Sequence, residues 1–268
     1  MKVSIVTISY NQAKFLEEAI LSVLEQDYND VEYIVVDPGS TDGSREIIER
    51  YRSRISAVIF DPDNGPADGL NKGFDVATGG VYGFLNADDV LERGALSDVV
   101  RFYELFPSVD VVSGNSWIID VNGVKKRRFY SDHFSIWMAV RQFSLLSQAS
   151  TFFKSEIYTR VCGFNIKNRI AWDGELFLDM ALSGAKFSCV NKFWSKFRVH
   201  EEGITGSGKL HQLYEEYRQY IFRRIVGRDI RMSDKMLMVF ARIIRKFKNP
   251  RDTIERLLHG PIYKSLKK

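Results

Sequence analysis

Two adjacent carboxylates, Asp88 and Asp89, follow the apolar run FLNA, and Asn86 lies two positions before the first of them. Adjacent like charges disfavour each other's ionised form unless a cation or hydrogen-bond donors lie beside them. Carboxylate oxygens are the ligands that Mg²⁺ and Mn²⁺ prefer, and Mg²⁺ commonly takes one or two carboxylates together with substrate phosphates. The pair therefore indicates either a metal that holds a nucleotide diphosphate, or a helix cap or solvated turn.

Three further apolar runs also end in polar residues. These runs are VSIVTIS (3–9), VEYIVVD (31–37) and ISAVIFD (55–61), and they lead into Tyr10, Asp37 and Asp61. Ligands of open α/β sheets bind beyond the carboxyl ends of the parallel strands. We therefore expect all these polar residues to gather with Asn86 and the Asp88 pair along one edge of a sheet.

The alternation of strand-like and helix-like segments predicts the fold class. Apolar residues recur at helical spacing in residues 11–26, 45–55 and 95–106, between the strand-like runs. This alternation predicts an α/β protein with a mostly parallel sheet that is flanked by helices. Residues 109–120 and 124–130 predict a hairpin at the sheet edge. Later helices are expected over 155–164 and 174–184, and later strands over 187–190 and 193–199.

Charge is unevenly distributed along the 268 residues. The net charge is +4, yet residues 218–268 hold 15 Lys and Arg against 4 Asp and Glu, a net charge of +11 that leaves −7 for residues 1–217. We therefore divide the chain into a first domain over 1–217 and a basic helical extension over 218–268.

Composition indicates the compartment. No stretch approaches the roughly 20 apolar residues that cross a bilayer. The N-terminal MKVSIVTISYN reaches Asn11 too soon for a signal peptide. The two cysteines, Cys162 and Cys189, lack metal-ligand spacing and lie in apolar segments, which predicts buried free thiols in a reducing compartment. We expect a cytoplasmic protein.

The segments SIVTISYNQ, VVDPGSTDGS and NGPADGLNKGFDVATGGVYGFLNADD share their order and spacing with a known family. They resemble the inverting family-2 glycosyltransferases, whose catalytic domain is a nucleotide-binding GT-A fold, and the resemblance covers residues 3–205. It implies that residues 1–217 are the catalytic domain of a hexosyl- or N-acetylhexosaminyl-transferase of polysaccharide biosynthesis. The implied donor is a nucleotide-sugar, with UDP favoured by the same association, and the implied acceptor is a hydroxyl of a saccharide or lipid-linked saccharide.

The same resemblance implies a donor site. Asp37 would meet the base or ribose, and Asp88 takes the place of the second carboxylate of the Asp-x-Asp motif, which holds a divalent Mn or Mg ion. Asn86 replaces the more usual first Asp, which leaves the metal with fewer charged ligands. The implied donor-binding residues are Thr7, Ser9, Tyr10, Asp37, Asp68, Lys72, Asn86, Ala87, Asp88, Gln148 and Arg198, and the implied metal ligands are Asp88, Asp89 and His200. Thr7 as an inward strand residue and His200 as a structural histidine stay open as alternatives.

AWDGELFLDMA (171–181) resembles the family segment that carries the general base. Inversion requires a carboxylate that takes the proton of the attacking hydroxyl while the metal stabilises charge on the departing diphosphate. Asp173 falls on the base position, and Trp172 occupies the place where the family often has another acid. Glu175 is the alternative base, or else an exposed residue in the first turn of a helix.

One motif points to a different chemistry. GITGSGKL (203–210) matches the phosphate-loop pattern G-x-x-x-x-G-K but ends in Leu210, where Ser or Thr should bind Mg²⁺. We interpret it as a loop near the acceptor side. The stronger rivals to glycosyl transfer are a nucleotidyltransferase acting on a sugar phosphate, which would release pyrophosphate, and a non-catalytic nucleotide-sugar binding module.

The basic extension contains a cationic amphipathic helix, DKMLMVFARIIRKFK (234–248), and a shorter helix DTIERLLHG (252–260). The apolar face of the first comprises Met236, Leu237, Phe240, Ile243, Ile244 and Phe247. Three interpretations compete. The face packs on the first domain or in a homo-oligomer, or residues 231–268 attach peripherally to an anionic membrane surface, the inner face of the cell membrane. Nucleic acid is not expected as a partner, since no recognised binding module accompanies the charge.

Overall fold

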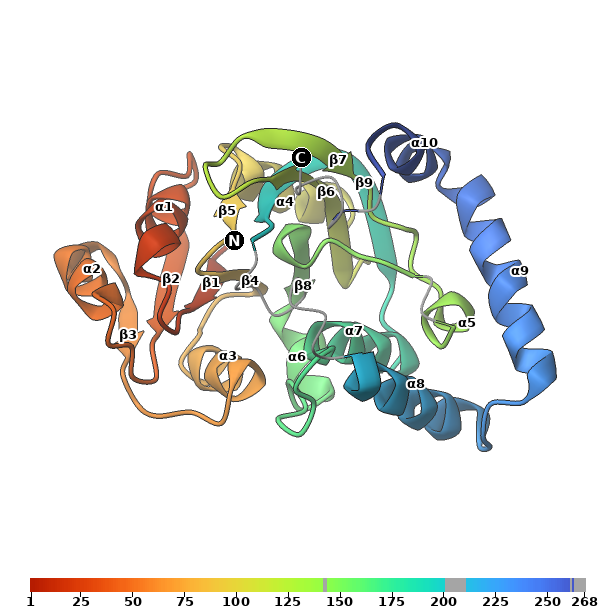
Figure 1. The fold of residues 1–268 in the computed structure, drawn as a ribbon. Coiled ribbons are helices and arrows are strands. Elements are labelled where there is room, and N and C mark those ends of the chain that lie inside the picture. The colour runs from red at the N-terminus through yellow and green to blue at the C-terminus, as the bar shows by residue number, and fades with distance from the viewer. Residues whose placement is uncertain (142–143, 201–210, 261, 263–268) are drawn as a thin grey trace.

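The computed structural model describes residues 1–141, 144–200, 211–260 and 262. The glycine-rich motif at 203–210 lies outside the described residues. In the described part, one nine-stranded sheet runs through the molecule in the order β3-β2-β1-β4-β8-β6-β9-β5, with β7 paired to β6 (Figure 1). Its strands are β1 (Val3–Ile8), β2 (Val31–Val36), β3 (Ala57–Ile59), β4 (Val81–Asn86), β5 (Val90–Leu91), β6 (Val111–Ile119), β7 (Lys125–Phe129), β8 (Thr151–Lys154) and β9 (Phe187–Arg198).

The first half of the sheet is parallel and the second half is mixed. β3, β2, β1 and β4 are parallel neighbours, whereas β8 is antiparallel to both β4 and β6. β6 pairs in parallel with β9, and their register shifts on both sides of Asn115. The neighbouring Gly114 is needed there, because an added Cβ would lie 2.6 Å from the ring of Trp194. This confirms the predicted α/β fold with a mostly parallel nucleotide-binding-type sheet.

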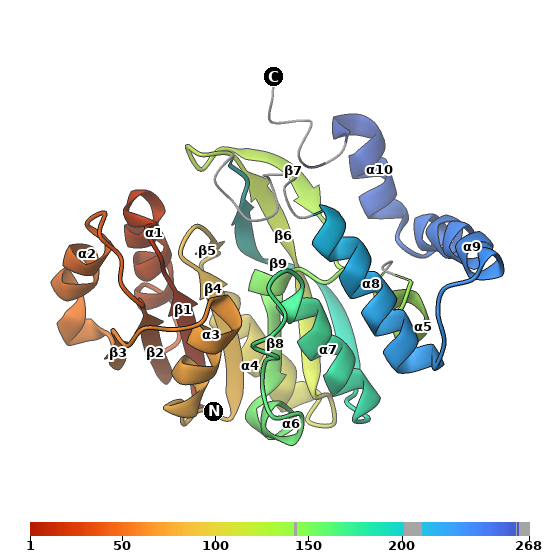
Figure 2. The same ribbon diagram turned by 60° about the horizontal axis from the view of Figure 1, so that its bottom comes forward.

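Helices cover both faces of the sheet (Figure 2). On one face, α1 (Ala13–Leu24), α2 (Ser44–Arg50) and α4 (Ala95–Leu105) share an apolar cluster with Val3 and Ile5 of β1. On the other face, α3 (Pro66–Asp75), α6 (Ser155–Arg160) and α7 (Trp172–Leu182) share a second cluster with Val6 of β1. Neighbouring residues of one strand fall in different clusters because successive side chains point to opposite faces.

The remaining helices follow the hairpin and the last strand. They are α5 (Ile136–Ala139), α8 (His211–Val226), α9 (Met232–Lys248) and α10 (Pro250–His259), with two short 3₁₀ turns at Arg52–Arg54 and Gln148–Ser150. The last three helices run along one side of the molecule and form its outer wall there (Figures 1 and 2). The proposed division between residues 217 and 218 lies inside α8. Within the described residues, no helix is long and apolar enough to span a bilayer.

Several sequence expectations are confirmed and others are corrected. The predicted hairpin is formed by β6 and β7. The two strands expected over 187–190 and 193–199 are one strand, β9, because β6 pairs with it on both sides of a bulge at the exposed Asn-Lys step at 191–192. Cys162 is exposed and not buried, since its backbone turns to a φ of 60° just after α6. The expectation that the apolar face of α9 packs on the first domain is wrong, because that face is turned outward.

Candidate functional site

The carboxyl ends of β1, β2 and β4 lie side by side. Ile8, the last residue of β1, pairs with Val36 of β2 and with Asn86 of β4. The residues that follow these ends, Ser9 and Asp37 among them, therefore line one edge of the sheet. This is the edge at which open α/β sheets bind their ligands.

Asp37 carries an unpaired buried oxygen at this edge. Its side chain is fully buried, and Oδ1 accepts the backbone N–H groups of Gly39 at 3.1 Å and Ser40 at 2.8 Å. Arg45 Nε donates to the same oxygen at 3.2 Å. Asp37 Oδ2 and the buried Ser9 Oγ have no hydrogen-bond partner in the described part of the chain. Unpaired buried polar atoms are costly, so these two atoms on neighbouring strand ends indicate a site for a ligand that offers hydrogen bonds.

The first strand presents its other candidate residues differently. Tyr10 is 62% exposed just beyond the end of β1, where its ring is free to cover a ligand. Thr7 is fully buried, and Tyr33 donates its hydroxyl proton to Thr7 Oγ1 at 3.0 Å. The prediction that Thr7 lines the donor site is therefore wrong, because the alternation of the strand turns this side chain into the core.

Asn86 and Gln148 are brought together from distant parts of the chain. Asn86 Nδ2 donates to Gln148 Oε1 at 3.2 Å, and Gln148 Nε2 donates to the carbonyl of Phe84 at 2.8 Å. The short turn at Gln148–Ser150 thus lies against the end of β4, and Ala87 is buried directly behind Asn86. The structure thus brings together two residues that the family resemblance assigned to the donor site.

Asp88 pairs with His200. Asp88 Oδ2 and His200 Nε2 lie 2.9 Å apart, the Asp88 side chain is 22% exposed, and the imidazole packs on Phe15 with ring centroids 5.0 Å apart. A carboxylate oxygen and an imidazole nitrogen are both divalent-metal ligands. In the residues that the structure describes, no group of three or more such side chains comes together. The site therefore offers two protein ligands, which suits a metal that takes its remaining ligands from a diphosphate and water.

Asp89 does not belong to that pair. Its side chain is fully buried, Oδ1 accepts the backbone N–H of Arg198 at 3.0 Å, and Oδ2 faces Asn86 Nδ2 at 3.4 Å. Burial, and then the neighbouring Asp88 charge, raises the pKa of Asp89 well above its usual range. The prediction that Asp89 is a metal ligand is wrong, because both of its oxygens are occupied inside the protein.

Arg198 is also structural. Its guanidinium donates to the backbone carbonyls of Asp88 at 2.9 Å and Asp120 at 3.1 Å, and it pairs with Glu18. Only 3% of the residue is exposed, and the guanidinium lies over the Phe15 ring, 4.8 Å from its centroid. The prediction that Arg198 binds the diphosphate is wrong, because its donors hold the Asp88 loop to the end of β9.

Asp68 and Lys72 of α3 shape the loop that follows β3. Asp68 Oδ2 accepts from the backbone and side-chain nitrogens of Asn64 at 2.8 and 3.0 Å, and Lys72 Nζ donates to the carbonyl of Pro62. Both side chains were predicted to face the donor. In the structure they instead form hydrogen bonds to Asn64 and Pro62 in this loop.

An exposed arginine that the sequence reasoning missed lies against that loop. A guanidinium nitrogen of Arg169 would be 3.3 Å from a Cβ built on Gly65, which begins α3. Its sequence signal is weak, a single cation four positions before Asp173. Arg169 supplies a positive charge beside the N-terminus of α3, where the helix dipole also favours anions.

Asp173 lies in the first turn of α7, close to β4. The preceding Trp172 packs on Phe84 of β4, with ring centroids 5.6 Å apart. Trp172 therefore fixes Asp173 beside the strand whose end carries Asn86. Asp173 Oδ1 accepts the N–H of Gly174 at 2.8 Å, and burial raises the pKa of the Asp173 carboxyl. A raised pKa on a partly exposed carboxyl is typical of a general base.

Glu175 cannot serve in its place. Its side chain is only 2% exposed, and its oxygens accept from Asn165 at 3.1 Å and Asn168 at 2.6 Å. Arg224 of α8 lies 3.4 Å away as an ion-pair partner. Both expectations for Glu175 are wrong, because it is neither a free base nor an exposed residue but a link between α7, its preceding loop and α8.

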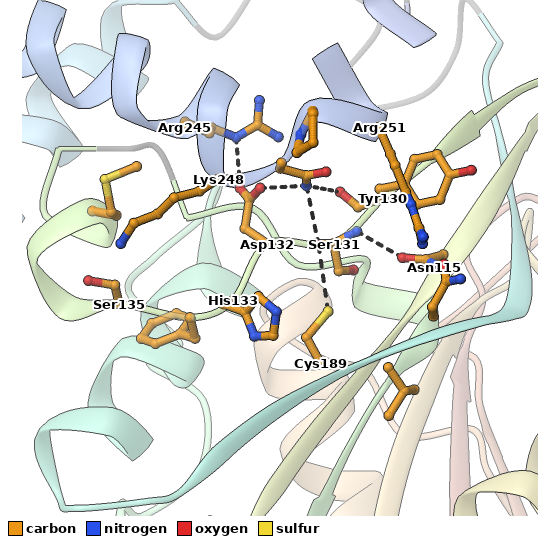
Figure 3. A pocket seen from close by; sticks show the side chains of 16 residues that line it. Asn115, Tyr130, Ser131, Asp132, His133, Ser135, Cys189, Arg245, Lys248 and Arg251 are labelled. Carbon is orange, nitrogen blue, oxygen red and sulfur yellow. Dashed lines mark hydrogen bonds and ion pairs between the residues drawn. The ribbon is translucent and has the colours of Figure 1, made fainter. Parts of the chain in front are cut away.

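One cavity of the described residues lies away from the strand-end edge of the sheet (Figure 3). It measures about 540 Å³ and lies between the middle of β6, the start of β9 and the junction of α9 with α10. Asp132 and Arg245 face each other across its wall. None of the predicted site residues lines it.

Comparison with known proteins places these features in context. The family model described as glycosyl transferase family 2 matches residues 4–165. An uncharacterized glycosyltransferase of Nostoc sp. is 29% identical over 211 residues, which make up 75% of this chain and 65% of that protein. The chain therefore spans just under two thirds of that relative.

Solved structures share the fold. The S. aureus protein TarS 1–349, in complex with UDP-GlcNAc, superimposes with a TM-score of 0.70 over 92% of this chain and 73% of that chain, at 21% identity. TarS is described as a poly(ribitol-phosphate) β-N-acetylglucosaminyltransferase. The mannosyltransferase PcManGT from Pyrobaculum calidifontis, in complex with GDP-Man and Mn²⁺, gives a TM-score of 0.66 over 99% of this chain and 73% of that chain, at 18% identity. At these identities the likeness is one of fold.

Proposed function

Because the chain belongs to glycosyl transferase family 2 and has the GT-A fold, we propose that it is an inverting glycosyltransferase. It would move a sugar from a nucleotide-sugar to a hydroxyl of a saccharide or lipid-linked saccharide. The observation that carries the proposal is the pair of unpaired buried atoms, Asp37 Oδ2 and Ser9 Oγ, at the edge where this fold binds nucleotides.

The donor that we propose is a UDP-sugar. Uracil has an imino N–H flanked by carbonyl oxygens, so Asp37 Oδ2 could accept from the base while the Ser9 hydroxyl donates to it. Tyr10, exposed beside them, offers a ring on which the base could stack. The UDP-GlcNAc bound to TarS supports this choice and an N-acetylhexosaminyl donor.

We propose that a divalent Mn or Mg ion assists. Asp88 and His200 would hold it, since their oxygen and nitrogen ligand atoms already lie 2.9 Å apart. When bound, the ion would neutralise charge on the diphosphate. Arg169 and the N-terminus of α3 would add positive charge beside it.

Asp173 is the proposed general base. The acceptor hydroxyl would attack the anomeric carbon of the donor sugar from the face opposite the diphosphate, and Asp173 would take its proton. One C–O bond then forms to the acceptor as the C–O bond to the diphosphate breaks, which inverts the anomeric centre. Asn86 and Gln148, fixed by their mutual hydrogen bond, would orient the donor ribose or sugar.

The acceptor proposal rests on the relatives. TarS acts on poly(ribitol-phosphate) by its description, which supports a polymer of cell-surface polysaccharide synthesis as the acceptor class.

The two free cysteines support a reducing, cytoplasmic location.

The experiment that tests this function measures products from a panel of nucleotide-sugars. Release of a nucleoside diphosphate that is lost in Asp173→Asn would support glycosyl transfer. Release of pyrophosphate would instead indicate a nucleotidyltransferase. Tight binding of a nucleotide-sugar with no turnover in the presence of acceptor polymers would indicate a binding module.

A further inference from the structure

The last two helices carry their apolar residues on the outside. Both form the outer wall of one side of the molecule (Figures 1 and 2). Phe247 of α9 and Leu257 of α10 are each 81% exposed. We define the outer stripe as the exposed apolar residues Met232, Met236, Val239, Phe240, Ile243 and Phe247 of α9 and Ile254, Leu257 and Leu258 of α10. Leu237 of α9, which is 40% exposed, lies beside it.

The residues on α9 form one continuous stripe. At 100° per residue, Met232, Met236, Val239, Phe240, Ile243 and Phe247 fall within about 100° of arc, which is the width of an amphipathic apolar face. Asp234, Met238, Ala241 and Arg245, which are buried, fall on the opposite side. An amphipathic helix on a globular domain normally buries its apolar face, and α9 does the reverse.

Buried charge pairs explain why α9 is turned this way. Arg245 donates to Asp132 at 2.7 Å and to Asp252 of α10 at 2.8 Å, and its side chain is 10% exposed (Figure 3). Asn249, between the two helices, donates to the carbonyl of Tyr130 at 3.0 Å and to Asp132 at 2.8 Å. These ion pairs and hydrogen bonds, together with Met238 in an apolar cluster with Val140 and Phe222, dock the inner side of α9, which leaves the outer stripe uncovered.

The border of the outer stripe is positive only. The acidic residues of α9 and α10, which the structure describes in full, are Asp234, Asp252 and Glu255, and all three are buried. Lys235, Lys246 and Lys248 of α9 are exposed, as is Arg251 of α10. The surface thus combines exposed apolar side chains with cations and presents no carboxylate.

This combination of exposed apolar and cationic side chains indicates which kind of partner the outer stripe binds. A second copy of the chain, docked stripe to stripe about a two-fold axis, would bring the two positive borders together. An anionic lipid surface receives the apolar side chains in its interface and attracts the lysines with its headgroups. We propose that the outer stripe of α9 and α10 docks the protein on the surface of an anionic bilayer. This inference goes beyond the proposed transfer reaction and does not depend on it.

Co-sedimentation of the full chain with vesicles tests the proposal. We expect binding to vesicles of phosphatidylcholine mixed with phosphatidylglycerol, and much weaker binding to phosphatidylcholine alone. Phe247→Asp with Leu257→Asp should reduce the bound fraction about tenfold or more, because each side chain loses its apolar burial and adds a negative charge. Phe106→Asp is the matched control, since Phe106 is an equally apolar residue, 52% exposed, just after α4.

Two results would overturn the proposal. One is equal partition of the wild-type chain and the Phe247→Asp, Leu257→Asp variant at low salt. The other is no vesicle binding by a wild-type chain that sediments as a dimer while the variant sediments as a monomer, which would assign the stripe to a second copy. Retention of the wild-type circular dichroism spectrum by the variant shows that any loss comes from the surface and not from unfolding.

Discussion

At the residue scale, the carboxylates at the strand ends have different roles because their burial and hydrogen-bond partners differ. Asp37 is held by three donors on one oxygen and leaves the other unpaired. Asp89 is fully buried, whereas Asp88 is 22% exposed and pairs with His200. Sequence reasoning placed Asp88 and Asp89 together as ligands, since only burial distinguishes two adjacent identical residues.

We predict that Asp173→Asn lowers kcat by about 10²- to 10⁴-fold, because the amide cannot take the proton of the acceptor. Nucleotide binding should be unchanged, which provides the control for folding. Unchanged turnover in this variant would remove Asp173 from the role of base.

The pH dependence of the wild-type enzyme gives a separate test of Asp173. A base acts only when ionised, so kcat/KM should fall as pH is lowered through the pKa of Asp173. Because burial raises that pKa, the fall should begin at a higher pH than for an exposed aspartate, whose pKa is about 3.9. A rate that stays level down to the range of an exposed aspartate would contradict the assignment.

We predict that Asp37→Asn weakens binding of UDP by about 10- to 100-fold, because an amide N–H would face the N–H of the base. Isothermal titration measures the change. Asp30→Asn, an exposed carboxylate just before β2 and therefore at the opposite end of that strand, is the matched control and should bind as the wild type does. Equal affinity in Asp37→Asn would show that the unpaired oxygen of Asp37 does not meet the donor.

At the element scale, the parallel half of the sheet was predictable and the second half was less so. β1, β2 and β4 are runs of β-branched and apolar residues with clear turn signals between them, so their boundaries follow from local pattern. β8 has four residues and β5 has two, and both exist only because β4, β6 and β9 offer them edges. Tertiary pairing of this kind leaves little local signal.

The roles of buried polar residues were the least predictable part of the site. Arg198 and Glu175 match family positions, yet each is enclosed by partners from distant segments, Glu18 and Asp120 for the first and Arg224 for the second. No spacing in the sequence brings those segments together. Gln148 was assigned to the donor site by the resemblance and not by any periodicity, and its hydrogen bond to Asn86 was not predicted.

We predict that Arg198→Met lowers the free energy of unfolding by roughly 3 kcal/mol, because backbone carbonyls at the Asp88 loop lose their donors. Urea unfolding measures the shift in midpoint at constant slope. Lys72→Met, which removes a single bond to Pro62 at the surface, should change stability far less. An Arg198→Met protein of wild-type stability that fails to bind UDP would instead make Arg198 a diphosphate ligand.

At the scale of the whole molecule, the strand-end edge and the outer stripe with its exposed lysines lie on different parts of the chain. The charge asymmetry was evident from the sequence, and so was the amphipathic helix. Its orientation was not, because the pairing of Arg245 with Asp132 joins residues 113 positions apart. A protein with this arrangement could act on a lipid-linked or membrane-bound polymer while its donor site stays open to water.

Thermal unfolding of the full chain against nucleoside diphosphates, each with and without Mn²⁺ or Mg²⁺, tests the central claim most directly. A ligand at 100 times its dissociation constant stabilises the folded state by about 2.7 kcal/mol. We predict stabilisation by UDP that grows with metal, loses the metal-dependent part in Asp88→Ala, and is reduced at least by about half in Asp37→Asn. No stabilisation of the folded wild-type protein by any nucleotide would contradict the assignment of the strand-end edge as a nucleotide-sugar site.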